Sequence, residues 1–195
     1  LLAAGAPLSE VTARLADALR LRARLLPATD GPLRTRIETA AGVFGFQTWF
    51  VERGTEDEAD GVHYAGAAEA VAAPGVVSAI DAADAIVITP SNPHVSIGPI
   101  LAVSEIRAAL ARRRVPCVAV SPLIGGRAVK GPADRMLERI EGGTSPWHVA
   151  AFYEGLIDTL VFDATLTLHR EPLSGTTLAR ALLAFPLITL KVSYA

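Results

Sequence analysis

The stretch that decides the fold is "AIVITPSNPHVSIGPILAVSEIRAALARRRVPCVAVSP", residues 85–122. Residues 85–90 are nearly all apolar, as expected of a strand buried on both faces. Residues 103–114 have the spacing of an amphipathic helix, with arginines in the last turn, where they suit the helix dipole. Residues 115–122 repeat the strand pattern. Strand, helix and strand at this spacing predict a parallel α/β sheet with right-handed crossovers.

The flanking sequence continues this alternation. Helices are expected from "APGVVSAIDAAD", from residues 131–140 and from "PWHVAAFYEGLI", and a third strand from residues 158–163. The fold class is therefore predicted to be α/β, a doubly wound, Rossmann-like and mostly parallel sheet with flanking helices. Residues 164–195 are less consistent, since "TTLARALLAF" could form a helix and "LITLKVSYA" a strand.

The amino-terminal third has a different pattern. A helix with Ser9 as its cap is expected near residues 8–21, followed by a short strand that ends at the turn residues of "PATDGP". Two strands are expected over "LRTRIETAAGVFGFQTWFVERG", with Trp49 and Phe50 packing into a core from an alternating strand, and another at "VHYAG". This predicts a small β-rich subregion near residues 22–65. The whole chain, 1–195, is expected to be a single α/β domain, incomplete at its amino terminus.

Composition narrows the function classes. With 51% hydrophobic and 19% charged residues, the chain of 195 residues is globular rather than disordered. A net charge of −2 and a pI near 6.1 argue against a nucleic-acid binder. No apolar run reaches the roughly 18 residues that span a membrane, so a cytoplasmic protein is expected. The single cysteine, Cys117, lies in an apolar run and is expected to be buried and inert.

Two unusual segments lie at the carboxyl ends of the strands predicted within residues 85–90 and 115–122. The first corner is "PSNPHVSIGP", residues 90–99, and the second corner is "SPLIGGRAVKGP", residues 121–132. In a doubly wound sheet, ligands bind beyond the carboxyl ends of the strands. Hydroxyl and amide donors, glycines that admit a ligand close to the backbone, and a following helix suit a phosphate or nucleotide. The predicted binding residues are Ser91, Asn92, Pro93, Ser96, Ile97, Gly98, Ser121, Gly125, Gly126, Lys130 and Gly131.

A purely structural reading of these corners is also open, because glycine and proline mark turns in all proteins. Neither corner has the spacing of a known nucleotide-binding loop. Other chemistry is sparse. The histidines lack metal-ligand spacing, although His94 lies within the first corner, and the serines lack the context of a catalytic triad. Asp163, at the end of a predicted strand, is expected to cap the next segment, and Asp30 is expected in a turn.

These segments also resemble a known family. "PSNPHVSIGPILAV" followed by "VAVSPLIGGRAVKGPADRML" is similar to the CofD family, the 2-phospho-L-lactate transferases of coenzyme F-420 biosynthesis. Supporting similarity occurs in "GAPLSEVTARLADAL", "RLLPATDGPLRTRIET", "FQTWFVERG" and "HVAAFYEGLIDTLVFD". The resemblance covers most of residues 5–163.

The resemblance implies a specific reaction. A guanosine diphosphate carries a small acid, lactyl or, in actinobacteria, enolpyruvyl, on its outer phosphate, and the terminal hydroxyl of the deazaflavin Fo attacks that phosphorus. GMP leaves, and Mg²⁺ is required. The two corners and Lys130 would hold the diphosphate. The expected partners are these small molecules, with no nucleic acid and no membrane, and an exposed sheet edge would permit a homodimer.

The sequence also departs from the family pattern. The family's glycine-rich turn, acidic motif and Gly-Asp-Arg-Asp stretch do not occur in these residues, so no catalytic residue can be named and metal ligands are expected outside this sequence. The resemblance also fades after Asp163. A truncated or frame-disturbed chain, inactive alone, is therefore one expectation. A non-catalytic nucleotide-sugar-binding regulator of the CofD-like gluconeogenesis-factor type is the alternative function.

Overall fold

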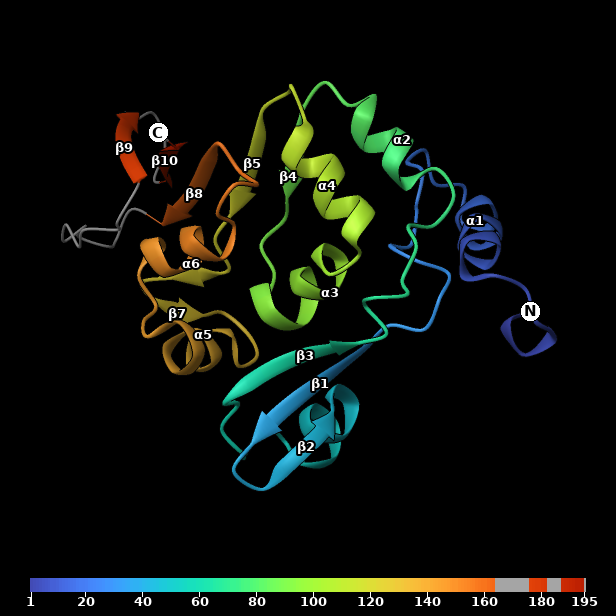
Figure 1. The fold of residues 1–195 in the computed structure, drawn as a ribbon, viewed down its shortest axis with the longest axis horizontal. Helices are drawn as coiled ribbons and strands as arrows, with labels where there is room; N and C mark the ends of the chain where they lie inside the picture. Colours follow the sequence, from blue (N-terminus) through green and yellow to red (C-terminus); the bar gives the residue numbers. More distant parts are fainter. Residues whose placement is uncertain (164–175, 182–186, 195) are drawn as a thin grey trace.

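Three parallel strands form the centre of the computed structural model (Figure 1), namely β4 (Ile86–Ile88), β5 (Cys117–Val120) and β8 (Thr159–Asp163). In their register Ile88 lies opposite Ala119, and Val120 lies opposite Val161. The structure describes residues 1–163, 176–181 and 187–194. Two antiparallel strands, β10 (Leu187–Tyr194) and β9 (Thr176–Ala181), complete the order β4-β5-β8-β10-β9. The predicted α/β class, with a parallel sheet and flanking helices, is confirmed.

Helices connect and cover these strands (Figure 1). They are α2 (Val76–Asp81), α3 (Gly98–Leu101), α4 (Ser104–Arg112), α5 (Ala133–Glu141) and α6 (Pro146–Phe152). Their apolar faces join the strands in one buried cluster that includes Val103, Ile106 and Leu160. Cys117 belongs to this cluster and is fully buried, and burial raises the pKa of its thiol, as its apolar context predicts. The helix predictions over residues 73–84, 103–114 and 131–140 are confirmed within a few residues, and the helix predicted over 146–157 begins as expected but ends at Phe152.

The β-rich subregion is a separate antiparallel sheet with the order β2-β1-β3. Its strands are β1 (Arg34–Thr39), β2 (Gly42–Gly45) and β3 (Gly61–Ala65), and the single-turn η2 (Thr48–Glu52) packs beside it. Ile37 and Trp49 from this lobe form a second buried cluster with Met136 of α5. The lobe is therefore fixed to the main sheet through α5. It lies at the lower end of the molecule in Figure 1.

Four local predictions are wrong. No strand forms at residues 22–26, where the nearest pairing is an isolated bridge between Thr29 and Ala72. Trp49 and Phe50 lie in the helical turn η2 rather than in a strand, although Trp49 is buried as predicted. Residues 176–181 form β9 rather than a helix. Strand β4 is the edge of the described sheet and Val87 is 62% exposed, so β4 is not buried on both faces.

The amino-terminal helix is capped differently from the prediction. After a short turn, η1 (Leu2–Ala4), helix α1 (Leu8–Ala18) has Pro7 at its N-cap position. Ser9 lies inside the helix, and its backbone N–H and hydroxyl both donate to the carboxylate of Asp30, at 2.6 and 2.7 Å. Asp30 thus satisfies the first turn of α1 from 21 residues away. Sequence spacing alone does not reveal such a long-range cap.

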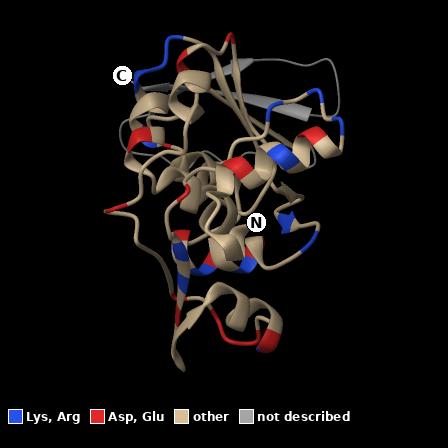
Figure 2. Ribbon diagram, turned by 90° about the vertical axis from the view of Figure 1, so that its right-hand side faces the viewer, with Lys and Arg blue, Asp and Glu red and all other residues tan. Residues whose placement is uncertain are grey.

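Charges of both signs are interspersed over most of the ribbon (Figure 2). Over the described part of the chain, no single helix has the length and apolar character to span a membrane. Residues 93–101 and 104–112 meet both criteria only when they are taken together, and they are bent by 86°.

Candidate functional site

The first corner folds into a short, wide helical turn instead of a loop. This turn, η3 (Pro93–Ile97), has π-type hydrogen bonds and leads directly into α3. Prolines and a glycine bracket it, and Asn92 begins it in an extended conformation. Pro93, His94, Ile97 and Gly98 are buried, whereas Ser91 is half-buried and Ser96 is exposed. Much of the first corner is therefore packed inside the protein.

Asn92 is the cap of this turn. Its side-chain oxygen accepts hydrogen bonds from the backbone N–H groups of His94 and Val95, at 2.9 and 3.3 Å. Its amide nitrogen lies 3.3 Å from the sulfur of Met136 on α5. Because the oxygen already satisfies two amides of the turn, η3 does not present those amides to an anion. The Asn92 amide group, which has only the weak acceptor sulfur as its partner, keeps donor capacity for a ligand.

His94 is buried beside a carboxylate. Its Nε2 lies 3.4 Å from Oε1 of Glu141, and its ring meets Phe152 edge-on. Burial lowers the pKa of His94 to about 4 and raises the pKa of Glu141. The imidazole is therefore neutral at pH 7, so the contact with Glu141 is not an ion pair under these conditions. This geometry gives His94 a packing role and no nucleophile to activate.

The second corner is a mostly exposed hairpin with a two-residue turn. Strands β6 (Leu123–Ile124) and β7 (Arg127–Ala128) are joined by Gly125 and Gly126, which have φ values of 57° and 75°. Two successive positive φ values define the type I′ turn that suits a tight hairpin, and they favour glycine at both positions. Gly131, at φ 77°, provides a third left-handed residue before α5.

The base of this hairpin is anchored to the end of β8. The backbone N–H of Ser121 donates to the carbonyl of Val161 at 2.8 Å, and the Ser121 hydroxyl accepts from the N–H of Leu123 at 3.2 Å. The N–H of Gly125 donates to the carboxylate of Asp163 at 3.0 Å. Asp163 therefore holds the preceding corner as well as ending its own strand. The prediction that it caps the next segment falls on residues 164–175, outside the described residues.

The second corner carries the positive charge of the candidate site. Lys130 is exposed, and the Arg127 side chain is 85% exposed, with its guanidinium 3.2 Å from the carboxylate of Asp134. No side chain caps the amino terminus of α5, which follows directly after Pro132. The carboxylate of Asp134, in the first turn, accepts the N–H of Arg135 at 3.0 Å, so an anion would meet only the other first-turn N–H groups and the ammonium group of Lys130. The two corners thus differ, because Asn92 caps the first helix start, whereas the second has no N-cap hydrogen bond and only the N–H of Arg135 is bound, by Asp134.

Both corners lie at the same end of the sheet, beyond the carboxyl ends of its strands. Their parent strands β4 and β5 are hydrogen-bonded neighbours, and the carboxyl ends of both point toward the same side (Figure 1). Both corners also contact α5, the first through Asn92 and η3, and the second through β7 and the Arg127–Asp134 pair. The two corners are therefore neighbours at this end of the sheet, with α5 in contact with both.

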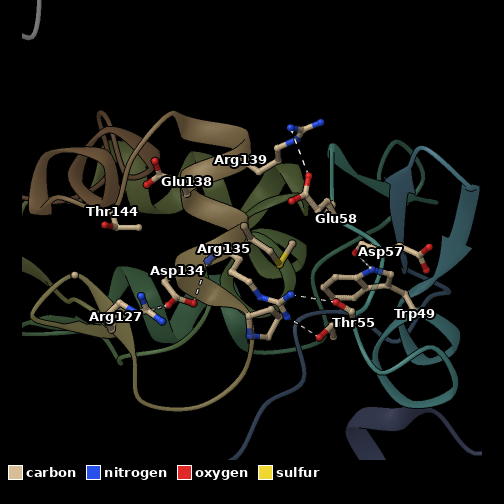
Figure 3. A pocket seen from close by; sticks show the side chains of 14 residues that line it. Trp49, Thr55, Asp57, Glu58, Arg127, Asp134, Arg135, Glu138, Arg139 and Thr144 are labelled. Carbon is tan, nitrogen blue, oxygen red and sulfur yellow. Dashed lines mark hydrogen bonds and ion pairs between the residues drawn. The ribbon is translucent and has the colours of Figure 1, made fainter.

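A cavity of about 760 Å³ lies around α5, between the second corner and the β-rich lobe (Figure 3). Arg135 crosses it, and its guanidinium donates to the backbone carbonyl and hydroxyl of Thr55, at 3.3 and 2.8 Å. Arg139 pairs with the carboxylates of Glu58 and Asp60. Of the predicted binding residues, Gly126 is on the lining of this cavity, and the first-corner residues are not.

The described residues do not by themselves fit a magnesium site. They contain no cluster of three or more His, Cys, Asp or Glu side chains arranged to hold a metal ion. The nearby carboxylates of Asp134 and Asp163 are already engaged by Arg127 and by the N–H of Gly125. These residues therefore support no chemical step that passes through a metal.

Two residues that the sequence did not suggest shape the first corner. Met136 of α5 contacts Asn92, and Tyr64 of β3 donates a hydrogen bond to the carbonyl of His94 at 2.5 Å. Neither has a sequence signal, because each looks like an ordinary apolar or strand residue until the β-rich lobe is placed. The corners themselves were detectable from their glycines and prolines.

A family model for "2-phospho-L-lactate transferase CofD" matches residues 1–180. The chain belongs to the CofD family. This membership accounts for the two corner sequences and confirms the resemblance drawn from them.

Two curated CofD relatives illustrate the similarity. A 2-phospho-L-lactate transferase of Methanosarcina mazei is 38% identical over 159 residues, covering 82% of this chain and 52% of its own. A phosphoenolpyruvate transferase of Thermobifida fusca is 44% identical over 157 residues, covering 78% of this chain and 48% of its own. The chain thus spans about half the length of the curated relatives that it matches.

A solved structure supports the fold of this CofD chain. A protein member of the UPF0052 family from Bacillus halodurans superposes with a TM-score of 0.59 at 19% identity, covering 83% of this chain and 47% of its own. At this level of identity the likeness concerns the fold alone.

Proposed function

We propose that this chain supplies the donor-binding part of a transferase in coenzyme F-420 biosynthesis. The transferase moves a phospholactyl or phosphoenolpyruvyl group from a guanosine diphosphate-linked donor to the terminal hydroxyl of the deazaflavin Fo, and GMP is released. The observation that carries the proposal is the placement of the two CofD-type corners at the ends of neighbouring strands, with both against α5. The relatives named as transferases supply the reaction class.

The chemistry explains why two different corners would serve this reaction. The attacked phosphorus is surrounded by negatively charged oxygens, so catalysis of the transfer depends mainly on positioning and on charge stabilisation. Lys130 and the first-turn N–H groups of α5 that Asp134 leaves free would neutralise charge on the diphosphate. The first corner, fixed by Asn92 and its prolines, would present Ser91 and the Asn92 amide at a constant position.

Mg²⁺ is part of this proposal as a requirement of the complete reaction. When bound, it would supply positive charge that stabilises the leaving GMP. Since the described residues do not fit a metal site, none of them is assigned a part in holding Mg²⁺.

The proposal is tested by titrating this chain with nucleotides in the presence of Mg²⁺ and measuring the binding by isothermal titration calorimetry. GDP is expected to bind, and a UDP-sugar is expected to bind at least tenfold more weakly, a difference of about 1.4 kcal/mol. Preference for the UDP-sugar would support the nucleotide-sugar-binding regulator instead. Failure to bind either nucleotide would overturn the donor-binding role. Mixing Fo with the donor and measuring GMP release then reports whether the chain alone completes the transfer.

A further inference from the structure

Tyr64 connects the β-rich lobe to the first corner. It lies on β3, 30 residues before His94, and its hydroxyl donates a hydrogen bond to the backbone carbonyl of His94 at 2.5 Å. The side chain is half-buried, and burial raises its pKa to about 12. The hydroxyl therefore keeps its proton, and remains a donor, over the whole physiological pH range.

The carbonyl of His94 needs this donor because of the local sequence. In the π-type turn η3, the backbone N–H of Gly98 bonds to the carbonyl of Pro93, five residues earlier. The next bond of this ladder would join the N–H of residue 99 to the carbonyl of His94, but residue 99 is a proline and has no N–H. His94 is 5% exposed, so water offers little compensation. The Tyr64 hydroxyl takes the place of the missing amide.

Gly98 makes room for the same hydroxyl. Its φ of −53° is ordinary for any residue, so the backbone conformation does not require glycine. A methyl group at this position would overlap the Tyr64 hydroxyl oxygen and approach the ring carbon that bears it. Pro99 thus removes a backbone donor, and Gly98 leaves space beside the backbone. The Tyr64 hydroxyl replaces the missing donor and occupies that space. The "GP" of the first corner is explained by a side chain of the protein rather than by close approach of a ligand.

We propose that Tyr64 is a positioning residue that holds the first corner in the geometry needed to bind the donor diphosphate. This inference rests on the proposed function. Tyr64 acts through the backbone of η3 and does not contact the ligand. Through it the β-rich lobe determines where Asn92 and Ser91 lie relative to the second corner.

The direct test is Tyr64→Phe in the full chain, with GDP as the probe. The variant removes only the hydroxyl, and the expected result is a folded protein by circular dichroism whose GDP affinity in calorimetry is about tenfold weaker. Ser78→Ala is the matched control, because the Ser78 hydroxyl also donates to a carbonyl, that of Gly75 at 3.1 Å, but on the exposed helix α2. The control should bind GDP as the wild type does. Wild-type affinity in folded Tyr64→Phe would overturn the positioning role.

A double-mutant cycle measured by melting temperature tests the packing of Gly98 against Tyr64 independently of any ligand. Gly98→Ala is expected to lower the melting temperature strongly, whereas in a Tyr64→Val background the same change should cost much less, because the overlapping atoms are gone. Additive shifts would overturn the assignment of Gly98 to Tyr64. If the wild-type chain bound no GDP, the proposed function and the positioning role would both fail, while this cycle would still decide the packing. If the wild type and Tyr64→Phe bound equally, the positioning role alone would fail.

Discussion

The first corner and the second corner follow neighbouring strands of one sheet, yet they are built in opposite ways. The first is buried, bracketed by prolines, and has its helix start satisfied by Asn92. The second is a mostly exposed hairpin with left-handed glycines, a helix start without an N-cap hydrogen bond and the cation of Lys130. In the proposed donor site, the first corner would provide a fixed framework and the second would provide the positive charge.

The largest effect should come from the buried histidine of the first corner. His94 has a pKa of about 4 in the folded state and an ordinary value of 6.5 when unfolded, so between these values the unfolded chain binds more protons. The stabilisation is complete above about pH 6.5 and is lost as the pH falls toward 4, which amounts to about 2 kcal/mol between pH 7 and pH 5. Urea unfolding at both pH values measures it.

The matched variant for this prediction is His94→Gln, which cannot titrate. Its free energy of unfolding should depend less on pH over this range than that of the wild type. Glu141, the carboxylate nearest to His94, has a raised pKa and should offset part of the loss near its own titration. Equal pH slopes for wild type and variant would contradict a neutral, buried His94.

The next effect should come from the cap of the first corner. Asn92→Ala leaves the N–H groups of His94 and Val95 without their acceptor, and should reduce the free energy of unfolding by about 1–2 kcal/mol. Asn92→Asp keeps an acceptor oxygen and should retain most of the stability while it loses the amide donor. Thermal melting compares the three proteins. If both variants melted alike, the cap would not be the source of the stability.

A smaller effect is expected from glycine in the second corner. At Gly131, with φ 77° and open space around the position of a Cβ, alanine should cost about 1 kcal/mol through backbone strain alone. Asn tolerates this conformation better, so Gly131→Asn should lie between alanine and wild type in chemical denaturation. Gly131→Ala as stable as the wild type would show that the second corner relaxes to another conformation, and the contrast between the corners would then be weaker.

The smallest effect on stability should come from replacing Lys130, a change that is expected to alter GDP binding instead. The side chain is exposed, so Lys130→Ala should leave the melting temperature unchanged and weaken GDP affinity about fivefold, an effect that decreases at high salt. Lys130→Arg keeps the charge and should bind nearly normally. Should Lys130→Ala bind GDP like the wild type at low salt, the charge assigned to the second corner would have to come from elsewhere.

Much of the sheet could be predicted from sequence because its elements are periodic and local. Apolar runs identified β5 and β8, helical spacing identified α4 and α5, and glycines and prolines marked both corners. The partial burial of β4 was not predictable from its own residues, because an apolar run does not show whether other elements cover both faces of the strand. Val87 is the residue at which that prediction fails.

The details of the candidate site depended on contacts between distant residues. Asn92 appeared as a ligand donor in the sequence, and only the folded turn shows its oxygen occupied by two backbone amides. Gly98 appeared as a position for close ligand approach, and only the placement of β3 shows that Tyr64 occupies that space. The "GGR" of the second corner, in contrast, carries a local hairpin signal that could have been read as a type I′ turn.

The most direct test of the central claim is hydrogen–deuterium exchange of this chain with and without GDP. If both corners hold one diphosphate, backbone amides of residues 91–98 and 121–131 should become protected together as GDP is added, with the same concentration dependence. Protection confined to one corner, or found only around Thr55 and Arg135 in the α5 cavity, would contradict the account.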